Sequence, residues 1–182
     1  MPPVSDEGTF EVYEKGSEAP KEATNFKALE HNIYKINFDG ALFENQNTGG
    51  IGVVFRDGRE NFKTAVKRRE QFVSESYEVE ALSTCFAEEL GQQHIILEGN
   101  CLRVIQALHM ISPDPMGHLI EEVNDRLRYF QSTKISHTER EGNIVAHLIA
   151  RSAAEGDSPV YWIEDPPSFI MDQLNVDVTA TF

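Results

Sequence analysis

The sequence has few cysteines and no long hydrophobic run. Its 182 residues include only Cys85 and Cys101, and two cysteines cannot form the disulfide framework of a small secreted domain. No apolar segment approaches the roughly 18 residues that cross a bilayer. The first residues lack the basic and then apolar arrangement of a secretory signal. We therefore expect an intracellular protein, in the cytoplasm or nucleus, that is neither secreted nor embedded in a membrane.

Basic residues are also scarce. The chain holds 16 Lys and Arg against 30 Asp and Glu, which gives a net charge of −14. The acidity is concentrated at the ends, because residues 1–32 hold seven acids and three bases, and residues 155–182 hold six acids and no base. This charge argues against a protein that binds phosphates by bulk attraction. It does not exclude a local basic patch or a metal-mediated phosphate site.

The order of the hydrophobic patterns predicts one domain between two tails. Residues 1–32 have no sustained periodicity and predict a flexible acidic arm, whereas residues 33–155 predict a single folded domain. Residues 156–182 predict a C-terminal extension that is partly packed on the domain, because Trp162 and Ile163 are too apolar to remain in water.

Within the domain, period-two patterns alternate with helical ones. The first three patterns predict an antiparallel meander of strands over residues 34–38, 49–56 and 62–67. The rest predicts helices over 74–90, after Asn100, from 112 to 130 and from 142 onward, with strands over 94–97 and 133–136. The fold class predicted is α/β, with a five-stranded mixed sheet, three antiparallel strands first, and helices on both faces.

Several polar side chains follow the ends of these strands and should meet at one edge of the sheet. They are Asp39, Glu78 and Glu80, the segment 98–100, His137, and the first turns of the last helix from Asn143 to His147. A cluster of oxygen ligands is what Mg²⁺ prefers. Two such ions about 4 Å apart can activate a water and stabilise the leaving oxygen of a phosphodiester.

At these residues the sequence resembles the plant reverse-transcriptase-like ribonuclease H domain family, within the ribonuclease H-like superfamily. The similar segments are 35–41 (KINFDGA), 49–57 (GGIGVVFRD), 78–82 (EVEAL), 97–105 (LEGNCLRVI) and 137–150 (HTEREGNIVAHLIA). Each motif alone is weak, but their order is specific, and the resemblance covers roughly residues 33–176. It implies the ribonuclease H-like fold and an endonuclease that hydrolyses the RNA strand of an RNA–DNA hybrid with two metal ions.

The resemblance also assigns roles residue by residue. Asp39 matches the first metal-binding aspartate, and Glu78 matches the glutamate, with Glu80 as a close alternative. Asn100 occupies the third carboxylate position, and His147 occupies the fourth, where plant members often carry histidine. His137 matches the mobile histidine, which assists proton transfer or product release. The implied cofactor is Mg²⁺, with Mn²⁺ as a second possibility.

Two of these positions depart from the carboxylate pattern. Asn100 offers a neutral amide oxygen, and His147 offers an imidazole, which suits Zn or Mn better than Mg. The site then holds about two negative charges where the family has about four, so paired Mg²⁺ ions should bind weakly. We predict a ribonuclease H-like domain whose cleavage is weakened or lost. The alternatives are a non-catalytic module that binds RNA–DNA hybrid or double-stranded RNA, and a protein-interaction domain.

Each site residue also has an ordinary structural explanation. Asp39 can belong to a turn, Glu78 and Glu80 can be solvated acids early in a helix, and Asn100 and Asn143 can cap helices. His147 can be a packed or surface histidine. Only the ordered resemblance raises these residues to site candidates.

A single dense basic cluster remains. It consists of Lys63, Lys67, Arg68 and Arg69. These side chains either prevent the edge of the sheet from pairing with other strands or, together with Asn143, contact a nucleic-acid backbone. The sequence favours the edge slightly, because the segment 112–115 is too short for a basic helical handle. It leaves the oligomeric state open.

Overall fold

The computed structural model describes residues 33–71, 94–109, 117–128, 130–156 and 159–179. The predicted acidic arm and the predicted helix over 74–90, with Glu78 and Glu80, lie outside these residues. No helix of the described part is long and apolar enough to cross a membrane.

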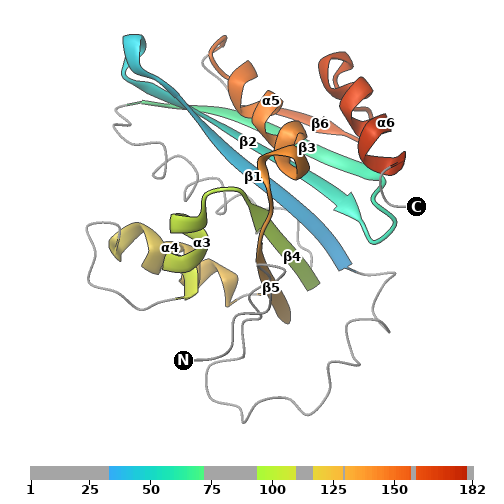
Figure 1. Ribbon diagram of the computed structural model, residues 1–182. Coiled ribbons are helices and arrows are strands. Elements are labelled where there is room, and N and C mark those ends of the chain that lie inside the picture. The colour runs from blue at the N-terminus through green and yellow to red at the C-terminus, as the bar shows by residue number, and fades with distance from the viewer. Residues whose placement is uncertain (1–32, 72–93, 110–116, 129, 157–158, 180–182) are drawn as a thin grey trace.

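The described residues form one mixed sheet in the order β5-β4-β1-β2-β3-β6 (Figure 1). The strands are β1 (Ile33–Phe43), β2 (Thr48–Asp57), β3 (Phe62–Gln71), β4 (His94–Gly99), β5 (Ser132–His137) and β6 (Val160–Ile163). The predicted meander is confirmed, because β1, β2 and β3 pair antiparallel. Strands β4 and β5 continue the sheet in parallel from β1, so the predicted mixed sheet is confirmed as well.

The sheet has six strands where the sequence predicted five. The additional strand, β6, belongs to the predicted C-terminal extension and pairs antiparallel with β3. Its four residues are too few to establish a period-two pattern, and the tail was predicted only to pack on the domain. Pairing with β3 is what makes this short apolar segment a strand.

Helices lie on both faces of the sheet, as predicted (Figure 1). They are α3 (Leu102–His109), α4 (Gly117–Leu127), α5 (Ile144–Ser152) and α6 (Met171–Thr179), with 3-10 turns η1 (Glu44–Gln46), η3 (Arg140–Asn143) and η4 (Ser168–Ile170). Helices α3 and α4 cover one face, while α5 crosses β1, β2 and β3 on the other, with α6 beside it.

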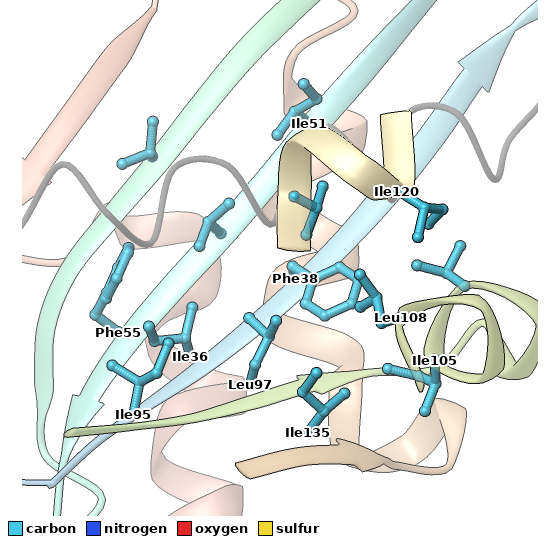
Figure 2. Close-up of a cluster of buried hydrophobic side chains, with 14 residues drawn as sticks. Ile36, Phe38, Ile51, Phe55, Ile95, Leu97, Ile105, Leu108, Ile120 and Ile135 are labelled. Carbon is cyan, nitrogen blue, oxygen red and sulfur yellow. The ribbon is translucent and has the colours of Figure 1, made fainter. Parts of the chain in front are cut away.

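The pleat of β1 assigns its side chains to these two faces. Ile36 and Phe38 are fully buried in the larger hydrophobic cluster, against residues of α3 and α4 (Figure 2). Asn37 and Asp39 therefore point to the opposite face, which α5 covers. A central strand thus presents a carboxylate to the helix that carries His147.

Candidate active site between strand β1 and helix α5

Asp39 and His147 are in direct contact. Asp39 is 3% exposed, and its Oδ2 lies 2.7 Å from His147 Nδ1. Its other oxygen, Oδ1, accepts a hydrogen bond of 2.9 Å from the amide of Gly40. Burial raises the pKa of the Asp39 carboxyl, and the hydrogen bonds from His147 and Gly40 lower it only in part. Both oxygens of the predicted first metal ligand are thus already hydrogen-bonded within the protein.

Asn143 links the same strand to the end of β4. Its Nδ2 donates to the backbone carbonyl of Phe38 at 2.9 Å and to Oδ1 of Asn100 at 3.3 Å. The pairing of β1 with β4 ends at Phe38 and Gly99, so the carbonyl of Phe38 takes a side-chain partner beyond that point. Oδ1 of Asn143 is buried and has no hydrogen-bond partner among the residues that the structure describes.

The alternative explanation of Asn143, as a residue whose side chain caps the last helix, is not supported. Asn143 occupies the N-cap position of α5, but its side chain makes no capping hydrogen bond. The amide is directed instead into the sheet, where a backbone carbonyl and Asn100 accept from it. The side-chain oxygen of Asn100, for which helix capping was the alternative explanation, is the acceptor, and α3 begins two residues later at Leu102.

His137 completes the group from the other side of β4. It is the last residue of β5, and its Nε2 donates to the backbone carbonyl of Asn100 at 3.2 Å. The amide of Thr138, which follows, donates to the carbonyl of Gly99 at 3.0 Å. The loop after β5 is therefore attached to the end of β4, next to Asn100.

The structure brings together five of the predicted site residues. Two hydrogen-bonded groups meet at β1: one joins Asp39 to His147, and the other joins His137, Asn100 and Asn143. The predicted glutamates, Glu78 and Glu80, lie outside the described residues.

A second polar group lies on the same face of β1, and only its member Glu98, in the segment 98–100, was predicted to lie at this edge. Asn37 is 1% exposed, donates to Oε2 of Glu98 at 3.1 Å and accepts from Arg56 at 3.2 Å. Lys35 lies 3.2 Å from the same Glu98 oxygen. The period-two spacing of Lys35, Asn37 and Asp39 was the signal in the sequence. Because Glu98 is held by Lys35 and Asn37, its carboxylate does not replace the one absent at Asn100.

The basic cluster lies on β3, two strands from β1, and its side chains have other partners. Lys67 donates to the carbonyls of Ser152 and Glu155, at the end of α5. Arg69 donates to the carbonyl of Ala154 at 3.2 Å and also to Gln46. Lys63 and Arg68 are more exposed, at 42% and 44%, and pair with Asp57 and Glu70. Contact of this cluster with a nucleic acid stays a prediction, for which Lys63 and Arg68 are the more exposed members.

The described residues do not fit a pair of Mg²⁺ ions. Among the described residues, no three His, Cys, Asp or Glu side chains converge on a point that could hold a metal. The only carboxylate in the group, Asp39, has both oxygens occupied, one by the His147 imidazole and the other by the backbone amide of Gly40. Mg²⁺ requires several oxygen ligands in an octahedron, with anionic charge to repay its dehydration.

The pKa shift of Asp39 predicts how stability depends on pH. The folded state holds this proton more tightly than the unfolded state, whose pKa is near 3.8. The contribution of Asp39 to stability is therefore complete below that value and is lost as the pH rises through the raised pKa. We expect Asp39→Asn to flatten this decline. Urea unfolding from about pH 4 to 7 measures it, and a decline that is equally steep in both proteins would contradict the assignment.

Comparison with known proteins identifies the family and the fold of this chain. The family model described as reverse transcriptase-like matches residues 37–153, which is most of the sheet together with α3, α4 and α5. The chain has a ribonuclease H-like fold. It belongs to the reverse transcriptase-like family. A search of curated proteins finds no match.

Solved structures agree on the fold. RNase H1 from the halophilic archaeon Halobacterium salinarum is 22% identical with a TM-score of 0.62, over 67% of this chain and 97% of that one. The N-terminal RNase H domain of a Mycobacterium tuberculosis protein is 15% identical with a TM-score of 0.59, over 66% and 92%. LC11-RNase H1, isolated from compost and solved with an RNA/DNA hybrid, is 17% identical with a TM-score of 0.55, over 66% and 95%. At these identities the likeness establishes the fold alone.

Proposed function

We propose that this chain binds RNA–DNA hybrids and cleaves them weakly or not at all when Mg²⁺ is the metal. The observation that carries the proposal is the contact between Asp39 Oδ2 and His147 Nδ1, 2.7 Å apart, beside the end of β4, where Asn100 follows the strand. The imidazole of His147 and the amide of Asn100 occupy the two positions where the carboxylate pattern of the ribonuclease H family has anionic oxygens. Binding of a hybrid is supported by the family and by the fold shared with an RNase H1 solved on an RNA/DNA hybrid.

The loss of cleavage follows from charge. Asp39 is the only carboxylate in the described group, and burial already raises its pKa, so the site is poor in the negative charge that divalent ions need. A carboxylate about 4 Å from an ion contributes on the order of 4 kcal/mol per unit charge at an effective dielectric of 20. Replacing two carboxylates by neutral groups therefore removes enough electrostatic attraction to prevent two Mg²⁺ ions from binding together.

Recognition of the duplex needs no metal at this position. Proteins recognise A-form helices through the shape of the wide minor groove and through contacts with phosphates and 2′-hydroxyls. Uncharged donors and acceptors can make such contacts, and an overall acidic protein can use a local basic patch for the phosphates. The chain therefore keeps a route to hybrid binding after cleavage is lost.

The test is binding and cleavage on one defined hybrid. We expect fluorescence anisotropy to give saturable binding that weakens with salt, and gel analysis to give no Mg²⁺-dependent cleavage under the same conditions. Double-stranded RNA and double-stranded DNA of the same sequence measure selectivity. Robust turnover in Mg²⁺ would contradict the proposed loss of activity, and absence of affinity at low salt would contradict the proposed binding.

One variant and its control test whether the duplex contacts β3. Reversing Lys63 and Arg68 to Glu removes two exposed charges whose surface ion pairs contribute little to stability. If each contacts a phosphate, the slope of log K against log salt falls by roughly one per side chain, so by about two in all. Reversing Arg128, which is exposed directly after α4 and pairs with Asp125, is the control. Equal slopes for both variants would exclude β3 as the phosphate contact.

A further inference from the structure

We propose that the side chains of Asn100 and His137 recognise a 2′-hydroxyl of the RNA strand and make the chain prefer an RNA–DNA hybrid to duplexes that lack this hydroxyl. The inference rests on the proposed binding of hybrids and names the atoms that select the RNA strand. Both side chains are half-buried, Asn100 directly after β4 and His137 at the end of the neighbouring β5 (Figure 1). We call this pair of side chains the hydroxyl site.

The carboxamide of Asn100 has a fixed orientation. The backbone carbonyl of Phe38 can only accept a hydrogen bond, so the atom of Asn143 that lies 2.9 Å from it is the amide nitrogen Nδ2. The same nitrogen donates to Oδ1 of Asn100 at 3.3 Å. Because Asn143 is 1% exposed, its side chain is held in place by the surrounding residues. Oδ1 of Asn100 therefore faces Asn143, and the donor Nδ2 of Asn100 faces away from it.

The ring of His137 is fixed by a similar contact. Its Nε2 lies 3.2 Å from the backbone carbonyl of Asn100, which can only accept, so Nε2 carries a proton. In a neutral imidazole with its proton on Nε2, Nδ1 is an acceptor. Neither Nδ1 of His137 nor Nδ2 of Asn100 has a hydrogen-bond partner among the residues that the structure describes. The end of β4 thus offers one donor and one acceptor to a ligand.

One donor and one acceptor together match a hydroxyl group. The 2′-hydroxyl both donates and accepts, and it is the group by which a protein distinguishes RNA from DNA. A phosphate oxygen only accepts, so it can satisfy Nδ2 of Asn100 but not Nδ1 of His137. A carboxylate at position 100 would accept and could not donate. The asparagine that removes a metal ligand from this position is therefore also the residue that supplies the donor.

The experiment compares two duplexes by fluorescence anisotropy with the full chain, in EDTA. One is an RNA–DNA hybrid, and in the other the RNA strand carries 2′-fluoro sugars, which keep the A-form pucker but cannot donate a hydrogen bond. The readout is the ratio of the two dissociation constants. We expect Asn100→Ala to lower the preference of the wild-type chain for the RNA hybrid by about tenfold, because a site that binds a hydroxyl disfavours the analogue without it.

Two further variants accompany Asn100→Ala. His137→Phe removes the ring nitrogens and should lower the same ratio. The matched control is Asn61→Ala, which should leave the ratio unchanged. Asn61 is exposed between β2 and β3, beside the start of β1, whereas Asn100 follows the end of the parallel strand β4.

A second measurement needs no variant and decides the matter if Asn100→Ala disturbs the fold. The side-chain amide resonance of Asn100 in the wild-type chain should shift when the RNA hybrid is added, and shift less with the 2′-fluoro duplex. An unchanged resonance, or equal weakening of both duplexes by Asn100→Ala, would overturn the proposal while hybrid binding stands. Absence of binding to both duplexes would contradict the proposed function, and this inference with it.

Discussion

The double variant Asn100→Asp/His147→Asp should cleave an RNA–DNA hybrid in Mg²⁺ at least 100-fold faster than the wild-type chain. It places two carboxylates beside Asp39, at the positions where the structure holds an amide and an imidazole. It also removes the imidazole that now occupies Asp39 Oδ2, so this oxygen becomes available to a metal. A 100-fold gain requires about 2.7 kcal/mol of transition-state stabilisation, which is less than one added carboxylate can contribute at this range.

The matched controls for this gain are the two single variants and a knockout. Asn100→Asp alone restores one carboxylate but leaves Asp39 bonded to His147, so we expect a smaller increase. Asp39→Asn in the double variant should abolish the gain, because it removes the central ligand. Cleavage of the labelled RNA strand measures all of them at equal protein concentration. A double variant no faster than wild type would show that the two substitutions do not limit activity.

The second large effect concerns the packing that holds His147 in place. Gly52 on β2 lies directly beneath α5, and a Cβ at this position would lie 2.3 Å from the carbonyl oxygen of Ala146 and 2.3 Å from the amide nitrogen of Ala150. Both atoms are backbone of α5, which cannot move aside without leaving the sheet. We expect Gly52→Ala to lower the free energy of unfolding by about 3 kcal/mol.

Displacement of α5 should also change the surroundings of His147. His147 lies on this helix, so the contact with Asp39 should lengthen or break in Gly52→Ala, and the chemical shifts of the His147 ring should change. The control is Gly142→Ala, whose Cβ would meet the Thr138 side chain, at 2.5 Å from its hydroxyl, and no backbone atom of α5. Urea unfolding and imidazole NMR measure both variants. Equal stability of Gly52→Ala and wild type would contradict the close packing of α5 on β2.

The strands of the sheet were predictable because their patterns are local. Ile36 and Phe38 alternate with Asn37 and Asp39, and this alternation alone places the two pairs on opposite faces. The strand β6 was missed because its four residues owe their conformation to pairing with β3. A nonlocal contact of this kind leaves no period in the sequence.

That the described site residues lie close together was also predictable, but their contacts were not. An asparagine before a helix is usually its cap, and only the register of β1 with β4 reveals that Asn143 faces the carbonyl of Phe38. The contact of Asp39 with His147 joins residues 108 positions apart. The choice between Glu78 and Glu80 stays a prediction, since both lie outside the described residues.

The most direct test of the account is a crystal structure of the wild-type chain with an RNA–DNA hybrid and millimolar Mg²⁺. The account predicts a bound duplex, with His147 Nδ1 still hydrogen-bonded to Asp39 Oδ2 and without two Mg²⁺ ions beside these residues. Two fully occupied Mg²⁺ ions coordinated by Asp39, with His147 turned away, would contradict it.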